Sequence, residues 1–139
     1  MSKNLILYIE DEDFQAKIFS KIIESELDSY NYKVKIINNG EDFITLLNNQ
    51  NKTFNDINLN EIGLILIDLA MHDISGVQLL QEIKKHQITL PVAILTARED
   101  DNIKQQITDL GANDYFIKGK NIEELARLRD FIIANMQLI

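Results

Sequence analysis

Four short apolar runs in this sequence each end in a side chain that could take part in chemistry. These ends carry, in chain order, Glu10 with Asp11, then Asp68, then Thr96, and finally Lys118. Clustered carboxylates repel one another unless a hard cation lies between them, and Mg²⁺ prefers such oxygen ligands. A metal ion would offset the charge of an incoming phosphoryl group, which Thr96 could hydrogen-bond and Lys118 could attract. Asp68, the most central carboxylate, could act as the nucleophile and form an aspartyl-phosphate.

The four runs, together with a fifth apolar segment, are predicted to be strands of one parallel sheet. Leu64–Ile67 is short, partly β-branched and bounded by Gly63 and by polar residues, which is typical of a strand covered on both faces. The five predicted strands span residues 5–9, 33–37, 64–67, 92–95 and 114–117. In open α/β folds, ligands bind at the edge of the sheet where the carboxyl ends of the strands lie. This arrangement would bring Asp68 and its partners together.

Amphipathic segments follow the strands and predict helices near residues 14–29, 43–47, 77–86, 103–110 and 125–136. In the first segment, an apolar stripe recurs at helical spacing and predicts the apolar face of the helix. The stripe consists of Phe14, Ile18, Ile22 and Leu27, with Phe19 and Ile23 beside it. The stretch 48–62 is less regular, and its six asparagines predict a helix end followed by a surface loop. Five repeats of strand and helix predict an α/β fold with helices on both faces of the sheet.

Composition narrows the class of protein. The 139 residues carry a formal net charge of -8, which argues against broad binding to nucleic acid or to anionic membranes. No cysteine is present, so disulfides and thiolate metal sites are excluded. No apolar run approaches the length of a membrane span, and the N-terminus lacks the apolar core of a signal peptide. We therefore expect one cytoplasmic domain over residues 1–139 that contacts neither nucleic acid nor a membrane.

Taken together, these residues resemble a known family, the receiver domain of two-component response regulators. The stretch 68–76 (Asp-x-x-Met-x-x-x-x-Gly) is similar to the family's phosphoacceptor loop, and 94–97 (Ile-Leu-Thr-Ala) is similar to its switch-threonine motif. The stretch 111–118 (Gly-Ala-x-Asp-Tyr-x-x-Lys) is similar to its last strand, and the resemblance extends from residue 4 to residue 133. It implies a doubly wound, flavodoxin-like (βα)5 fold whose five strands, numbered in chain order, lie side by side as 2-1-3-4-5.

The resemblance implies a phosphoryl acceptor with a metal site. Asp68 would accept a phosphoryl group from a histidine kinase or a phosphotransfer protein. Mg²⁺ would be ligated by Asp11, by Asp68 and by the backbone carbonyl of Ala70, with Glu10 acting mostly through water. The chain is accordingly not expected to be an enzyme.

The resemblance also implies a switch. Lys118 would contact the phosphoryl group, and Thr96, followed by Ala97 in the motif, would move to bond a phosphoryl oxygen. Tyr115 would swing inward behind Thr96, although plain core packing is an equally open interpretation of this residue. These movements would change the face made by the helix at 103–110, the strand at 114–117 and the last helix. An unidentified output protein or a second copy of the chain would bind there.

The sequence departs from the family pattern at several positions of the expected site. His72 and Gly119 stand where the family usually has proline, and Glu10 stands where aspartate is commoner. Ala70 and Arg98 occupy two positions that tune hydrolysis of the phosphoryl group in the family, and an alanine does not orient water by hydrogen bonding. None of these changes removes a central residue, so we expect phosphoryl acceptance with altered kinetics. His72 is interpreted as a loop residue rather than a metal ligand, because no second His or Cys lies nearby in the sequence.

Two other classes of function stay open. A pseudo-receiver would keep the fold and bind partners without phosphate, and the departures at Ala70, His72 and Gly119 favour it. A Mg²⁺-dependent phosphohydrolase with an aspartyl nucleophile would need a second acid two residues after Asp68. Ala70 stands at that position, so this class is disfavoured.

The last predicted helix bears on partners. The stretch 123–129 is similar to the end of receivers that dimerise through this face, although Arg127 and Arg129 within it are otherwise expected to be solvated. The sequence ends shortly after this helix, so either it is a piece of a longer protein or output occurs by binding to a partner.

Overall fold

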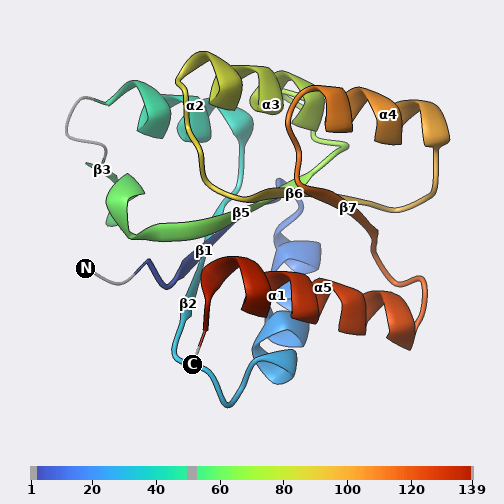
Figure 1. Cartoon of the computed structure of the whole chain (residues 1–139). Coiled ribbons are helices and arrows are strands. Elements are labelled where there is room, and N and C mark those ends of the chain that lie inside the picture. Colours follow the sequence, from blue (N-terminus) through green and yellow to red (C-terminus); the bar gives the residue numbers. More distant parts are fainter. Residues whose placement is uncertain (1–2, 50–52, 139) are drawn as a thin grey trace.

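A five-stranded parallel sheet forms the middle layer of the fold (Figure 1). The computed structural model describes residues 3–49 and 53–138, and the five strands lie side by side in the order β2-β1-β5-β6-β7. Their bounds are, in chain order, Leu5–Ile9 for β1, Lys33–Ile37 for β2, Ile62–Asp68 for β5, Val92–Thr96 for β6 and Asp114–Ile117 for β7. When these five alone are counted, the order is 2-1-3-4-5, so the predicted fold class and topology are confirmed.

Helices cover both faces of the sheet (Figure 1). The helices α1 (Asp13–Glu26) and α5 (Ile122–Met136) lie on one face. The other face carries α2 (Gly40–Asn48), α3 (Gly76–Lys85) and α4 (Asp101–Asp109). The predicted helices are all present, although the first ends at Glu26 rather than near residue 29. None of the helices within the described residues is both long enough and apolar enough to cross a membrane.

Alternation along the central strands builds two separate apolar cores. Leu5, Leu7 and Ile9 of β1 join the core under α2, α3 and α4, whereas Ile6 and Tyr8 join the core under α1 and α5. Successive side chains of a strand point to opposite faces of the sheet, so all residues of β1, β5 and β6 are buried. A strand that is buried on both faces has its register strongly specified. The position of its carboxyl end is therefore fixed as well.

The buried face of α1 differs from the prediction. Phe14, Ile18 and Ile22 of the predicted apolar stripe are exposed, Phe14 to 72%. The buried face runs instead from Ala16 to Leu27, the one member of the predicted stripe that is buried. The small side chain of Ala16 lets the helix lie close to the sheet, and the bulkier residues beside it turn to solvent. Spacing alone did not show which of two overlapping stripes meets the core.

The segment predicted as a loop at 48–62 contains regular structure, so that prediction was wrong in part. The strand β3 (Thr53–Phe54) pairs antiparallel with β4 (Ile57–Asn58), and a 3-10 helix, η1 (Leu59–Glu61), leads into β5. Asn55 and Asp56 form the turn with φ angles of 48° and 64°, a left-handed conformation that Asn and Asp tolerate better than most residues. Asparagine thus marks a hairpin turn here. Residues 50–52 of the predicted loop lie outside the described residues.

We expect Gly63→Ala to destabilise the fold, because Gly63 lies where β5 meets the start of β1. A Cβ atom at this position would lie 2.2 Å from the Lys3 carbonyl oxygen, which belongs to the backbone and has little room to yield. Overpacking of this kind costs about 1–3 kcal/mol. Urea unfolding should show a lower midpoint for Gly63→Ala, while Lys21→Ala on the exposed side of α1 should change little. Equal midpoints for wild type and Gly63→Ala would contradict the packing described.

Candidate functional site

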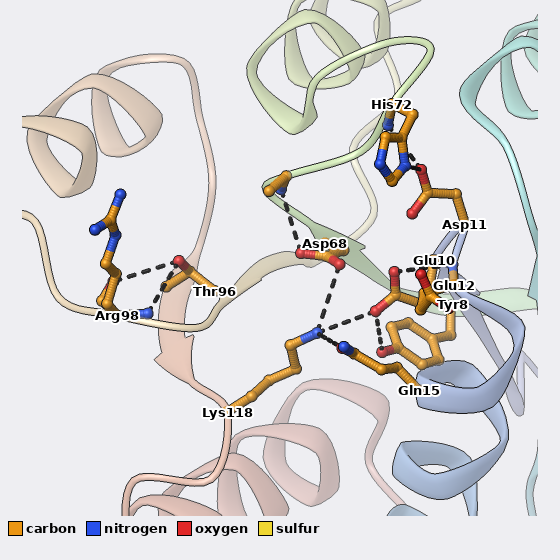
Figure 2. Close-up of polar contacts among 11 residues, drawn as sticks. Tyr8, Glu10, Asp11, Glu12, Gln15, Asp68, His72, Thr96, Arg98 and Lys118 are labelled. Atoms are coloured by element: carbon orange, nitrogen blue, oxygen red, sulfur yellow. Dashed lines mark hydrogen bonds and ion pairs between the residues drawn. The ribbon is translucent and has the colours of Figure 1, made fainter.

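Four predicted side chains lie at the carboxyl edge of the sheet, because each one ends or follows a parallel strand (Figure 2). Glu10 follows β1, Asp68 ends β5, Thr96 ends β6 and Lys118 follows β7. Glu10, Asp68 and Thr96 are buried despite their polarity. Buried polar groups are costly unless they are paired, so their contacts define what the site can do.

The Lys118 ammonium lies between two carboxylates (Figure 2). Its Nζ donates to Glu10 Oε1 at 3.0 Å and to Asp68 Oδ2 at 3.5 Å. A third bond, of 3.3 Å, reaches Gln15 Oε1 in the first turn of α1. The backbone N–H of Lys118 donates to the Thr96 carbonyl at 2.8 Å, which fixes the base of the side chain beside β6. One positive charge thus serves two buried carboxylates.

A single lysine does not balance the charge around Asp68. Burial raises the pKa of the Asp68 carboxyl to about 7 from an ordinary value of 3.8, because the charged form loses its hydration. A side-chain hydrogen bond with Glu10 raises it further, and the charge of Lys118 acts in the opposite direction. The cluster therefore favours either a proton or an additional cation.

Tyr8 and Gln15 hold this cluster in place, and the sequence interpretation missed both. The Tyr8 hydroxyl donates to Glu10 Oε1 at 3.4 Å, and the ring packs on Phe19 with centroids 5.6 Å apart. Burial, together with the charge of Glu10, raises the pKa of Tyr8 far above its usual range, so the hydroxyl keeps its proton. Strand alternation offered a signal for Tyr8, since it stands two residues before Glu10 and therefore on the same side of β1. For Gln15 no comparable signal exists.

Asp11 is paired with His72 rather than with the Lys118 cluster (Figure 2). The backbone N–H of His72 donates to Asp11 Oδ2 at 2.7 Å, and His72 Nδ1 lies 2.7 Å from the same oxygen. Partial burial acts to raise the pKa of the Asp11 carboxyl, but these hydrogen bonds prevail and hold it below its usual range. The hydrogen bond and charge of Asp11 in turn raise the pKa of His72. The loop residue His72 is thus part of the site.

Thr96 and Tyr115 meet at the same backbone carbonyl. Thr96 Oγ1 donates to the Arg98 carbonyl oxygen at 3.3 Å and accepts from the Arg98 N–H at 3.5 Å. The buried Tyr115 donates its hydroxyl proton to that carbonyl at 3.1 Å and accepts from the Asp100 N–H at 3.0 Å. The Tyr115 ring belongs to the core under α4, while its hydroxyl is bonded to the loop after β6. The burial of Tyr115 agrees with core packing, and its role in a switch stays a prediction.

The remaining predicted positions lie around this edge. Ala70 donates its N–H to Asp68 Oδ1 at 3.3 Å, so its backbone lies beside the central carboxylate. Ala97 and Arg98 are exposed at the start of the loop after β6. Gly119 has a φ angle of 71°, which proline, held near −65°, does not reach. The backbone after Lys118 thus differs from one that carries proline.

The metal-binding capacity of the edge rests on few side chains. Within residues 3–49 and 53–138, no three His, Cys, Asp or Glu side chains are grouped so that they could hold one metal ion. Asp11 and Asp68 accept hydrogen bonds from the backbone of the loop that carries Ala70. A metal at this edge would need main-chain carbonyl and water ligands in addition to these carboxylates, which is a common arrangement for Mg²⁺.

Two solved receiver domains share this fold. The receiver domain of the Francisella response regulator 1452 superposes with a TM-score of 0.71 at 21% identity, covering 96% of this chain and 97% of that chain. A response regulator receiver domain from Rhodospirillum rubrum has a TM-score of 0.71 at 29% identity, covering 94% and 92%. Fold and strand-edge residues together define the class as a receiver-type α/β domain.

Sequence comparison identifies the family. The model of the response regulator receiver domain matches residues 6–129, and the chain belongs to this family. The uncharacterized transcriptional regulatory protein YkoG of Bacillus subtilis (strain 168) is 35% identical over 138 residues, which are 97% of this chain and 54% of YkoG. The response regulator ArlR of Staphylococcus saprophyticus is 37% identical over 125 residues, which are 89% of this chain and 50% of ArlR. The chain thus spans about half the length of these curated relatives.

Without divalent cations, Asp68→Asn should stabilise the protein at neutral and alkaline pH. The fold raises the pKa of Asp68 from 3.8 to about 7, so it favours the protonated carboxyl, and stability is lost as pH rises through this window. The neutral amide lacks that dependence. Urea unfolding in EDTA should give the variant an advantage on the order of 1–3 kcal/mol above about pH 7, which shrinks as the pH falls toward 4. If the free energies of unfolding of wild type and Asp68→Asn differed by the same amount at every pH, the raised pKa of Asp68 would be refuted.

Proposed function

We propose that this receiver domain accepts a phosphoryl group on Asp68 from a histidine kinase or a phosphotransfer protein, in a Mg²⁺-dependent reaction. The observation that carries the proposal is the Lys118 ammonium held between Glu10 and Asp68 at the carboxyl edge of the sheet. An ammonium in that place would attract the phosphoryl oxygens while Asp68 is left as the central nucleophile. Thr96 lies at the end of the neighbouring strand and can donate a further hydrogen bond.

The donor set fits a hard divalent cation. Asp11 and Asp68 would supply carboxylate oxygens, Ala70 would supply its main-chain carbonyl, and Glu10 would act through water. The raised pKa of Asp68 is consistent with this, because burial and then Glu10 disfavour the ionised carboxyl, and a bound cation would favour it. When bound, the cation would offset the negative charge of the transferred phosphoryl group.

Asp68 and Lys118 would have different roles in the phosphoryl transfer. An oxygen of Asp68 would form the bond to phosphorus while the bond between phosphorus and the donor imidazole breaks, and the imidazole, protonated on its other nitrogen, leaves as a neutral ring. Asp68 must be ionised for this, and Lys118 favours that state by lowering its pKa. The phosphoryl group remains on Asp68 as a signal. The chain is thus proposed as a phosphoprotein and not as an enzyme.

The output would follow from the loop after β6. Thr96 would turn from the Arg98 carbonyl toward a phosphoryl oxygen, and Tyr115, bonded to the same carbonyl, would respond. The face made by α4, β7 and α5 would change as a result and bind an output protein or a second copy of the chain. These partners act by protein contact, and we propose a cytoplasmic location.

Arg127 organises this face. Its Nη1 lies 3.0 Å from both carboxylate oxygens of Asp114, Nη2 donates to the Tyr115 carbonyl at 2.6 Å, and Nε donates to Glu124 Oε1 at 2.9 Å. Its guanidinium carbon also lies 4.1 Å from the centroid of the Phe116 ring. Arg127 is exposed as predicted, yet it joins β7 to α5 instead of being merely solvated. A face that is ordered in this way supports the proposed role in binding.

The exposed stripe of α1 is the proposed docking site for the phosphodonor. Phe14, Ile18 and Ile22 lie one turn apart along α1, and Ile122 at the start of α5 is 82% exposed. A groove of about 290 Å³ between the two helices is lined by Ile22, Ile122 and Lys118. A partner must bring its phosphohistidine close to Asp68, and this apolar surface is continuous with the Lys118 side of the site. A helical phosphodonor domain with an apolar stripe of its own would suit it.

A pseudo-receiver that binds partners without phosphate is the alternative. It is favoured by the hydrogen bond of Thr96 Oγ1 to the Arg98 carbonyl, which engages the hydroxyl outside the Lys118 cluster. In that case, partner binding would be unchanged by Asp68→Ala. Whether partner binding requires Asp68 therefore distinguishes a phosphorylated receiver from a pseudo-receiver.

Incubation with Mg²⁺ and acetyl phosphate should label wild type and leave Asp68→Asn unlabelled, because the amide is not a nucleophile for phosphorus. Asp28→Asn, at an exposed aspartate beyond the end of α1, should be labelled like wild type. Incorporation of radioactive phosphate is the measurement, and EDTA should suppress it. Equal labelling of wild type and Asp68→Asn would rule out Asp68 as the acceptor.

Ile18→Asp should separate donor docking from chemistry. With acetyl phosphate the variant should be labelled at the wild-type rate, because Ile18 lies outside the Lys118 cluster. With a histidine kinase that phosphorylates wild type, transfer should fall about tenfold or more, since a charge would be buried in an apolar contact. Lys21→Ala, also on the exposed side of α1, serves as the control. Loss of labelling with both donors, or with neither, would contradict the docking site.

A further inference from the structure

The loop between β5 and α3 is held in place from both of its flanks. Leu69 donates its N–H to the Leu95 carbonyl at 2.8 Å, and Gly76 donates to the Leu69 carbonyl at 3.0 Å, which closes the base of the loop. The Asp73 carboxylate accepts from the N–H of Gly40 at 2.9 Å and from that of Glu41 at 3.1 Å, so the far side of the loop is tied to the start of α2. The residue between these anchors, His72, therefore has a backbone position that the fold determines.

His72 makes two contacts with one oxygen of Asp11. Its backbone N–H and its ring Nδ1 both lie 2.7 Å from Asp11 Oδ2. The imidazole itself is almost fully exposed, with 90% of the side chain accessible, so the contact is not forced by burial. A proline at this position would have no N–H and no ring donor, and both contacts would be lost.

We propose that His72 is a positioning residue for the metal site, which holds Asp11 Oδ2 so that Oδ1 is presented to a divalent cation. This inference rests on the proposed function, in which Asp11 ligates Mg²⁺. Groups that hydrogen-bond a metal ligand fix its orientation, and their removal typically costs 10–100-fold in metal affinity. His72 would perform this task with both backbone and side chain, which makes the affinity of the site depend on a residue outside the ligand set.

In the described part of the chain, the Asp11 carboxylate is hydrogen-bonded by His72 and by the backbone of Asp11 itself, so His72 is the partner from outside that residue. The Lys118 ammonium instead contacts Glu10, Asp68 and Gln15. A free Asp11 side chain would have to be ordered when the ion binds, and that ordering would weaken binding. Because His72 orders the carboxylate beforehand, the cation meets a ligand that is already in place.

Titration of the amide resonances with Mg²⁺ at one fixed pH tests the proposal. We expect His72→Ala, which keeps the N–H, to bind Mg²⁺ about tenfold more weakly than wild type, and His72→Pro, which loses both contacts, to bind more weakly still. His72→Asn should restore affinity to nearly that of wild type, because its amide nitrogen can take the place of Nδ1. His86→Ala is the matched control, since that histidine contacts Asn48 and Glu82 away from the site.

The outcomes separate this inference from the function on which it rests. Mg²⁺ affinity of His72→Ala equal to or greater than that of wild type would overturn the positioning role and leave the metal site intact. Weak binding by His72→Asn, as weak as that of His72→Ala, would overturn it as well. Absence of Mg²⁺ binding by wild type would overturn both the proposed metal dependence and the role of His72. Because His72 is exposed, its variants should unfold at nearly the wild-type temperature, and this measurement verifies that they are folded.

Discussion

The structure depends on keeping two carboxylates buried together with only one ammonium between them. Glu10 and Asp68 end or follow adjacent strands, so the parallel pairing of β1 with β5 forces them to the same edge. Lys118 contacts both carboxylates, but burial, together with Glu10, still raises the pKa of Asp68. Removal of Lys118 would leave two buried carboxylates without a counter-charge, which is strongly unfavourable, so the lysine is the member of the cluster that the fold can least lose.

A rigid framework is needed to hold such a cluster, and the sheet supplies it. The strands β1, β5 and β6 are buried on both faces, so their ends have little freedom to separate and relieve the repulsion. Tyr8 is buried and donates its hydroxyl proton to Glu10, while Gln15 of α1 accepts a hydrogen bond from Lys118. The repulsion between the Glu10 and Asp68 carboxylates is therefore confined to one edge of the sheet. A proton, a metal ion or a change in the charge of Asp68 would alter this repulsion.

Most of the fold and the central site residues could be predicted because they follow from two periodicities and one geometric rule. Apolar runs and their spacing give strands and helices, and parallel strands must bring their carboxyl ends to one edge. The predictions that failed concern which face of a helix is buried and which conformation a loop adopts. The exposure of Phe14 is set by how α1 rolls on the sheet, and the hairpin at Asn55 is set by local φ angles. The pairing of His72 with Asp11 joins two loops 61 residues apart, and no sequence pattern encodes it.

The contacts around the Arg98 carbonyl give a physical route from the site to the proposed binding face. Thr96 and Tyr115 both donate to this carbonyl, so a turn of Thr96 toward Asp68 would leave Tyr115 as its remaining side-chain donor. The Tyr115 hydroxyl also accepts from the N–H of Asp100, whose own carboxylate caps the start of α4. Loss of one bond at the carbonyl therefore bears directly on the first turn of a helix. In the proposed function, a change of charge at Asp68 that redirected the Thr96 hydroxyl would therefore affect α4, because hydrogen bonds join β6 to the start of this helix.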